Sequence, residues 1–193
     1  IDNPNDFINS NIVGVYNLLE CFKDFSAKYK SKLIHISTDE VYGDIVTGRS
    51  SEKSTYNPSS PYAATKAASD HLVSAYENTF GFPANILYLS NNYGPYQHFE
   101  KLIPKIINSA LNNRAIPIYG DGTQRRTWLN VKDTCVGILK VIERGKTGER
   151  QDSPTFWYMV VIRSRASKSR VEKSDIESWI LEVGLYFVYG GPQ

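Results

Sequence analysis

The chain has 193 residues, of which 41% are hydrophobic and 22% are charged, so it can bury a core and form a globular domain. Its formal net charge of +2 gives no electrostatic reason to expect nucleic acid or a membrane as a partner. It has no signal peptide and no apolar run long enough to span a bilayer, so we expect a cytoplasmic protein. We expect Cys21 and Cys135 to be small buried residues in a reducing compartment, because their spacing matches no metal site.

The first half of the chain predicts a helix, a strand and a second helix. Apolar residues at helical spacing predict a helix over residues 4–29, capped by Asn5 or Asp6. The run LIHIS at 33–37 is typical of a buried parallel strand. A loop over 43–61 then precedes a helix that Ser59 or Ser60 can cap and that Gly81 can end.

The second half continues the alternation. It predicts a strand at 84–90, a loop at 91–97, a helix at 101–113, strands at 116–119 and 126–131, and a helix at 133–145 capped by Asp133. Alternating strands and helices predict an α/β fold with a parallel sheet covered by helices on both faces. Ligands bind at the carboxyl ends of such strands, so we expect STDE (37–40) and SNNYGP (90–95) to line one crevice.

Two adjacent carboxylates, Asp39 and Glu40, follow the first strand directly. They can take different roles if their environments separate their pKa values. A protonated carboxyl could donate a proton to a leaving hydroxyl, while an ionised one could remove a carbon-bound proton. The alternative is a capping aspartate beside a solvated glutamate.

Tyr62 and Lys66 are four residues apart in the second predicted helix and therefore share one helix face. A nearby ammonium stabilises a phenolate, so Lys66 is expected to lower the pKa of Tyr62 towards the range of a general base. Taken alone, the spacing is weak evidence, because Tyr and Lys often fall four residues apart by chance on an exposed helix face.

Four stretches resemble the extended short-chain dehydrogenase/reductase family, and within it the dTDP-glucose 4,6-dehydratases. They are STDEVYGD, NPSSPYAATKAASDHLVSAYENTFGFP, SNNYGPYQHFEKLIPKII and IPIYGDGTQRRTWLNVKD. The resemblance runs from about residue 5 to Glu149. It implies a partial Rossmann-like, doubly wound sheet in a partial NAD-binding and catalytic domain (1–149), followed by an unassigned tail with no family likeness (150–193).

The resemblance also implies a mechanism with NAD as the cofactor and a nucleotide sugar as the substrate. Tyr62 corresponds to the base for the 4-hydroxyl proton, and Lys66 to the residue that binds the nicotinamide ribose. Thr38 corresponds to the hydroxyl that contacts the C4 oxygen. Glu40 corresponds to the base that removes the C5 proton, and Asp39 to the acid that protonates the departing 6-hydroxyl.

Further positions correspond to binding residues of that family. Ser10, Ser37 and Asn92 match cofactor contacts. Substrate contacts are implied for Asn91, Lys101, Leu102, Pro117, Ile118, Tyr119 and Arg126. Asn11 matches an asparagine linked to helix distortion and proton relay. We expect no metal site, and His35 is expected to be a core residue rather than a ligand.

The sequence departs from the family in two places. It contains no G-x-x-G-x-x-G dinucleotide loop, so we expect a fragment that by itself binds NAD poorly. After Glu149 it no longer aligns with the family.

Three other enzymes of the superfamily stay open as alternatives: a UDP-glucose 4,6-dehydratase, an epimerase and a decarboxylase. The Asp39–Glu40 pair disfavours the last two. A non-catalytic remnant that docks onto a partner also stays open. The first helix and residues 60–80 match the elements through which the family forms homodimers.

Overall fold

The structure is a computed structural model that describes residues 3–45, 48, 50–116, 126–146 and 150–152. The described residues form two compact units. Unit 1 holds those up to Ser90 together with those from Cys135 onward, and unit 2 holds those from Asn91 to Thr134. No helix among the described residues is long and apolar enough to cross a membrane.

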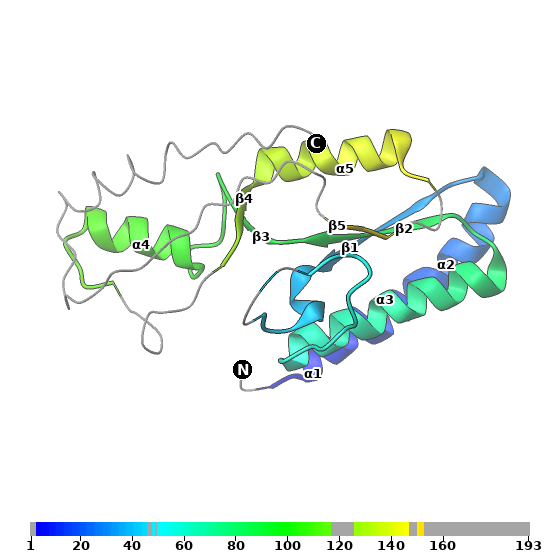
Figure 1. Cartoon of the computed structure of the whole chain (residues 1–193), viewed down its shortest axis with the longest axis horizontal. Coiled ribbons are helices and arrows are strands. Elements are labelled where there is room, and N and C mark those ends of the chain that lie inside the picture. Colours follow the sequence, from blue (N-terminus) through cyan, green and yellow to red (C-terminus); the bar gives the residue numbers. More distant parts are fainter. Residues whose placement is uncertain (1–2, 46–47, 49, 117–125, 147–149, 153–193) are drawn as a thin grey trace. The chain divides into compact units, whose positions relative to one another are not determined.

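A parallel sheet lies at the centre of unit 1. It contains β1 (Leu33–Thr38), β2 (Ala84–Leu89) and β5 (Arg150–Asp152) in the order β1-β2-β5. Leu33 lies opposite Ala84 and Thr38 opposite Leu89, so β1 and β2 end together. Helices α2 (Gly14–Tyr29) and α3 (Pro61–Phe80) cover one face of the sheet, and α5 (Val131–Arg144) runs along the other (Figure 1). The predicted parallel sheet with helices on both faces is confirmed.

The predicted first helix is confirmed, with a distortion inside it. It consists of α1 (Asn5–Ile8), a π-helical turn η1 (Asn9–Val13) and α2 (Gly14–Tyr29). The predicted cap at Asn5 or Asp6 is wrong, because the helix already begins at Asn5. The side chain of Asn3 accepts a hydrogen bond from the Asn5 N–H over 3.0 Å and satisfies one of the free amides at this end.

Helix α3 (Pro61–Phe80) follows the prediction at both ends. Ser60 Oγ accepts a hydrogen bond from the Ala63 N–H over 3.1 Å, and Pro61 occupies the first turn, where its missing N–H costs nothing. Gly81 adopts φ +72°, and its N–H donates to the Glu77 carbonyl over 2.8 Å. The helix therefore ends in the left-handed residue that glycine favours.

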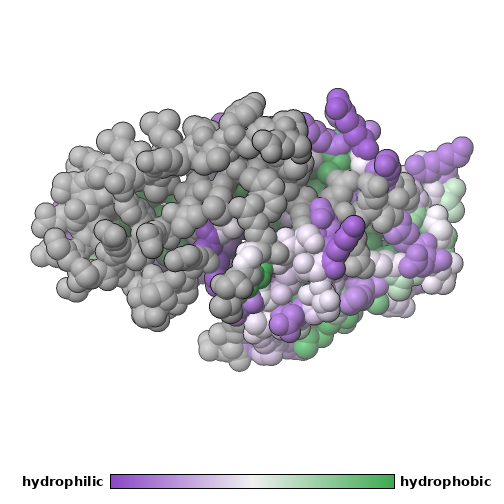
Figure 2. All heavy atoms as spheres, in the orientation of Figure 1, coloured by the Kyte–Doolittle hydropathy of each residue, from purple (hydrophilic) through white to green (hydrophobic). Residues whose placement is uncertain are grey.

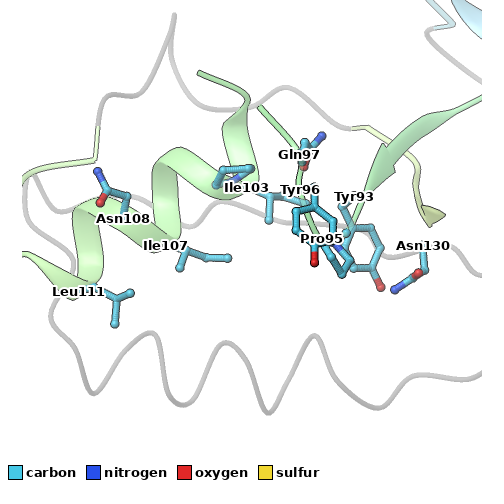
Figure 3. Close-up of a pocket in the computed structure, with 11 residues that line it drawn as sticks. Tyr93, Pro95, Tyr96, Gln97, Ile103, Ile107, Asn108, Leu111 and Asn130 are labelled. Carbon is cyan, nitrogen blue, oxygen red and sulfur yellow. The ribbon is translucent and has the colours of Figure 1, made fainter. Parts of the chain in front are cut away.

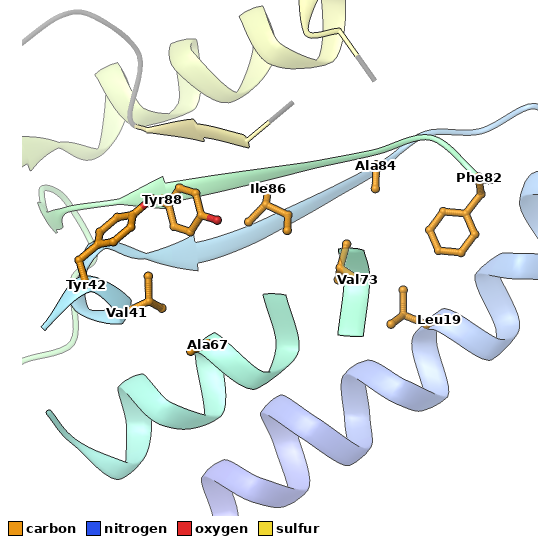
Figure 4. Packing of buried hydrophobic residues seen from close by; sticks show 9 residues of the cluster. All are labelled: Leu19, Val41, Tyr42, Ala67, Val73, Phe82, Ala84, Ile86 and Tyr88. Carbon is orange, nitrogen blue, oxygen red and sulfur yellow. The ribbon is translucent and has the colours of Figure 1, made fainter. Parts of the chain in front are cut away.

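The core of unit 1 lies between these helices and the sheet. Leu19 of α2, Val73 of α3, and Ile86 and Tyr88 of β2 are almost completely buried in one cluster (Figure 4). The expectation of buried cysteines is wrong, since Cys21 and Cys135 are both exposed. Cys21 lies two residues after Leu19, which turns it about 200° around the helix and away from the core.

Unit 2 contains a pair of short parallel strands, β3 (Asn91–Tyr93) and β4 (Trp128–Asn130), and helix α4 (Leu102–Leu111). The predicted loop at 91–97 is therefore wrong over its first three residues, which pair with a strand distant in the sequence. The predicted strand at 126–131 is confirmed as β4, whereas the one at 116–119 lies largely outside the described residues. Helix α5 begins at Val131, so Asp133 lies in its first turn and is not its cap.

Candidate active site

The two adjacent carboxylates lie in a short 3-10 helix, η2 (Asp39–Tyr42), that begins where β1 ends. Thr38 is the last residue of β1 and caps this helix, because its Oγ1 accepts a hydrogen bond from the Glu40 N–H over 3.3 Å. The same hydroxyl lies 3.5 Å from Asp39 Oδ1, to which it donates. Asp39 is half-buried and Glu40 is exposed, so their environments differ. The capping residue is Thr38 rather than the aspartate.

Tyr62 and Lys66 lie in the first turns of α3, in the same unit. The ring of Tyr62 is half-buried and meets the ring of Phe7 edge-on, with 5.6 Å between the ring centroids. Lys66 Nζ donates a hydrogen bond to the Ile36 carbonyl over 2.6 Å. This bond fastens α3 to β1 three residues before the first of the two carboxylates.

Electrostatics connect Tyr62 to the end of β1. Burial raises the pKa of Tyr62, and the negative charges of Glu40, Asp39 and Asp70 raise it further. Both carboxylates after β1 therefore act on the phenol. The expectation that Lys66 lowers the pKa of Tyr62 is wrong for this arrangement, since burial and carboxylates dominate and the Lys66 ammonium is directed to the Ile36 carbonyl.

The backbone of α3 at Tyr62 is tied to the π-helical turn. Thr65 Oγ1 donates to the Tyr62 carbonyl over 2.8 Å and accepts a hydrogen bond from Asn11 Nδ2 over 3.0 Å. Asn11 lies inside η1, where the resemblance implied a helix distortion. Ser10, a predicted cofactor contact, lies in the same turn and is exposed.

Sequence reasoning missed a buried polar group behind this site. Ser37 Oγ donates to Asp70 Oδ2 over 2.7 Å, and both residues are buried. Asp70 lies one turn after Lys66 on α3. The available signal was the spacing, because Tyr62, Lys66 and Asp70 follow one another at four-residue steps and therefore share a helix face. His35, by contrast, is a buried core residue, as expected.

The remaining predicted binding residues belong to unit 2. Asn91 and Asn92 lie in β3, and Thr134 Oγ1 donates a hydrogen bond to Asn92 Oδ1. Lys101 precedes α4, and Leu102 is its first residue. Arg126 is exposed. Pro117, Ile118 and Tyr119 lie outside the described residues. STDE belongs to unit 1, whereas SNNYGP belongs to unit 2 from its second residue on, so their common crevice stays a prediction.

A pocket in unit 2 lies beside α4 (Figure 3). Its walls include Tyr93 and Tyr96 on one side and Ile103, Ile107 and Leu111 of α4 on the other. None of the substrate contacts expected among the described residues lines it. Nowhere in the described part of the chain do three His, Cys, Asp or Glu side chains gather in a way that could hold a metal ion.

Comparisons with known proteins show the family of the chain. A family model described as GDP-mannose 4,6 dehydratase matches residues 1–168. The dTDP-glucose 4,6-dehydratase of Haemophilus influenzae is 49% identical over 152 residues, which cover 75% of this chain and 45% of that protein. The crystal structure of DesIV, a dTDP-glucose 4,6-dehydratase from Streptomyces venezuelae with NAD bound, matches with a TM-score of 0.74 and 40% identity, over 79% of this chain and 46% of that one.

An epimerase shares the same fold. The UDP-glucuronic acid 4-epimerase of Bacillus cereus matches with a TM-score of 0.69 and 33% identity, over 76% of this chain and 46% of that one. The chain spans less than half the length of each of these three relatives. The fold is thus the Rossmann-like fold of the nucleotide-sugar dehydratases and epimerases, as predicted. The chain belongs to the nucleotide-sugar 4,6-dehydratase family that the GDP-mannose 4,6 dehydratase model describes.

Proposed function

We propose that the protein containing this chain dehydrates dTDP-glucose to dTDP-4-keto-6-deoxyglucose with NAD as its cofactor. The observation that carries the proposal is the pair of carboxylates at the end of β1, both close enough to raise the pKa of Tyr62. Their environments differ, because Asp39 is half-buried and hydrogen-bonded to Thr38 whereas Glu40 is exposed. Unlike environments suit one carboxyl to act as an acid and its neighbour to act as a base. The relatives that are dTDP-glucose 4,6-dehydratases support the choice of substrate.

The donors at the start of α3 fit the ribose of a nicotinamide cofactor. Lys66 carries three ammonium protons and gives one to the Ile36 carbonyl, which leaves two for ribose hydroxyls and for the Tyr62 oxygen. The Tyr62 hydroxyl is half-buried at the same place. When bound, NAD supplies the site with a hydride acceptor that later returns the hydride. Without further positive charge Tyr62 stays protonated, because burial and the carboxylates raise its pKa.

The chain's own residues divide the proton transfers. Tyr62 must first lose its own proton to solvent. As a phenolate, stabilised by the Lys66 ammonium, it accepts the proton of the sugar 4-hydroxyl as C4 is oxidised, and the new ketone acidifies the C5 proton. Glu40 removes that proton, and Asp39 gives a proton to the departing 6-hydroxyl, which leaves as water. Loss of one C5 proton and one hydroxide balances the release of one water. The hydride that bound NAD would return reduces C6 while Glu40 gives its proton back to C5. Tyr62 then loses a proton to solvent and Asp39 regains one, which restarts the cycle.

The test is a substrate panel with matched variants. Mass spectrometry measures the loss of one water from each sugar nucleotide. We expect dTDP-glucose to lose it faster than UDP-glucose or GDP-mannose does. Asp39→Asn and Glu40→Gln should each slow this loss by about a hundredfold or more, as is usual when a general acid or base is removed, and should leave NAD binding nearly intact. Asp24→Asn alters an exposed carboxylate on α2 and serves as the matched control. Wild-type rates in both site variants would refute the assigned roles.

The same panel decides among the alternatives. Dehydration of UDP-glucose in preference to dTDP-glucose would support the UDP-specific alternative. Inversion at C4 without loss of water would support an epimerase, which the likeness to the UDP-glucuronic acid 4-epimerase favours. No reaction with any sugar, together with non-cooperative unfolding of the monomer, would support a non-catalytic remnant.

We also infer a homodimer through the first helix. The apolar side chains of this helix that are exposed include Val13, Tyr16, Leu18, Phe25 and Tyr29. Figure 2 shows hydrophobic atoms along the lower edge of unit 1, where α2 and α3 lie in Figure 1. Apolar surface that gathers in this way is typical of a protein interface. Analytical ultracentrifugation tests this dimer. We expect the wild type and the Asp24→Asn control to sediment as dimers and Leu18→Glu to sediment as a monomer. A monomeric wild type would refute the dimer.

We infer that the protein is located in the cytoplasm, because Cys21 and Cys135 are free and exposed. Exposed thiols persist in a reducing compartment and are oxidised outside it. Fractionation of cells with an antibody against the chain tests this location, and recovery from an extracytoplasmic fraction would refute it.

A further inference from the structure

A buried carboxylate lies behind the candidate active site. Asp70 of α3 is 0% exposed. Its Oδ2 accepts hydrogen bonds from Ser37 Oγ over 2.7 Å and from the Tyr56 hydroxyl over 3.1 Å. An unpaired carboxylate is strongly disfavoured away from water, so these donors are a condition for its burial. Asp70 is thereby held by β1 and by the loop that precedes α3.

The second oxygen of Asp70 faces His35. His35 Nε2 lies 3.1 Å from Asp70 Oδ1, which accepts no hydrogen bond from the residues that the structure describes. Nε2 also lies 3.3 Å from Ser69 Oγ. Ser69 gives its hydroxyl proton to the Lys66 carbonyl over 2.7 Å, so towards the ring its oxygen can only accept. Nε2 therefore carries a proton, and the positive edge of the imidazole faces the carboxylate.

Lys66 lies one turn before Asp70 on α3 and therefore shares a helix face with it. Its Nζ is bonded to the carbonyl of Ile36, between His35 and Ser37 on β1, and its own carbonyl accepts from Ser69. The titratable groups on α3 and on the elements that it contacts here include Tyr62 and Asp70 on α3, His35 on β1, and Asp39 and Glu40 in η2. Among them, Asp70 is the charge that counteracts burial: burial lowers the pKa of Lys66, and the Asp70 carboxylate raises it.

We propose that Asp70 is a positioning residue, whose carboxylate, locked by His35, Ser37 and Tyr56, keeps the Lys66 ammonium in place at the end of β1. As far as catalysis is concerned, the proposal rests on the proposed function. A neutral Lys66 amine could not give one proton to Ile36 and also stabilise a phenolate and a ribose. Asp70 touches neither the substrate nor the cofactor and acts through Lys66.

Competitive labelling of lysine amines as a function of pH tests this without any nucleotide. Only the neutral amine reacts, and mass spectrometry reports each lysine separately. We expect Asp70→Asn to speed the labelling of Lys66 near neutral pH by about threefold or more relative to the exposed Lys53 in the same molecule, since a shift of one pKa unit changes the neutral fraction tenfold. Tyr56→Phe is the matched control, because it removes one bond to Asp70 and keeps the charge; its Lys66 should label as in the wild type.

The outcomes separate the proposal from its alternatives. Unchanged labelling of Lys66 in a folded Asp70→Asn protein would overturn the proposal. Equal increases in Asp70→Asn and Tyr56→Phe would also overturn it, because loosened packing would then be the cause. Should Asp70→Asn fail to fold, nitrogen-15 NMR of the wild type decides: a slowly exchanging Lys66 ammonium supports the proposal, and exchange as fast as that of Lys53 overturns it. All of these results stand whether or not the protein dehydrates dTDP-glucose.

Discussion

The two units of this chain use polar residues in different ways. In unit 1 several polar groups around β1 and α3 are buried and hydrogen-bonded, as Ser37 and Thr65 illustrate. In unit 2 the helix α4, next to the predicted substrate residues, buries only Ser109, and it exposes Ile107 by 48% and Leu111 by 74%. The polar side chains around β1 and α3 are thus fixed in place, which acid–base chemistry requires, whereas α4 presents apolar side chains on its surface.

The difference in packing gives the largest expected effect. Leu19→Ala in the core of unit 1 should lower the free energy of unfolding by about 3 kcal/mol, because a fully buried leucine leaves a cavity. The same change at Leu111 in α4 should cost less than about 0.5 kcal/mol, because the side chain is largely exposed. Urea denaturation measures both. An equal cost at the two positions would show that the apolar face of α4 is packed in solution.

The turn after the carboxylates is a second place where unit 1 is rigid. Gly43 has φ +76°, and a Cβ there would lie 2.0 Å from the Asn57 carbonyl oxygen. Gly43→Ala should therefore cost about 3 kcal/mol, from strain together with a clash against backbone. Gly81→Ala is the control, since its φ is similar at +72° and nothing lies within 4 Å; it should cost about 1 kcal/mol. Thermal unfolding compares the two, and equal costs would contradict the clash.

Helix capping also differs between the two units, with a smaller expected effect on the free energy of unfolding. Ser60→Ala should cost about 1 kcal/mol, because it removes the acceptor for the Ala63 N–H at the start of α3. Lys101→Ala should leave stability nearly unchanged, because the Lys101 side chain makes no capping bond to α4. Denaturation midpoints provide the test. A large loss from Lys101→Ala would mean that the start of α4 is stabilised by the lysine after all.

The smallest expected effect is a titration. Since the pKa of Tyr62 is raised, the folded chain holds this proton more tightly than the unfolded chain does. The resulting stability is complete below the ordinary tyrosine pKa of about 10 and is lost as pH rises through the folded value. The pKa of Tyr62 is measured from phenolate absorbance, as the difference between proteins with and without the Tyr62→Phe change. We expect Glu40→Gln to lower this pKa and Asp39→Asn to lower it by less. An unchanged pKa in both would place the carboxylates too far from Tyr62.

The accuracy of the prediction from the sequence differs from one helix or strand to the next. Strands β1 and β2 and helices α2 and α3 were predicted well, because their apolar periodicity and the end signals Ser60 and Gly81 are local. At β3 the sequence predicts a loop, because Asn91 and Asn92 have low strand propensity and only pairing with β4 makes them a strand. The cysteines were misjudged because burial depends on which side of a helix meets the core.

The sequence by itself determined the family, the parallel α/β order and the position of Asp39 and Glu40 directly after a strand. These follow from patterns within short stretches of chain. Only the tertiary structure decided that the pKa of Tyr62 rises, that Lys66 bonds to the Ile36 carbonyl, and that Asp70 is the buried partner of His35 and Ser37. The physical reason is that burial and charge proximity depend on which distant residues share a volume, and no local pattern encodes that.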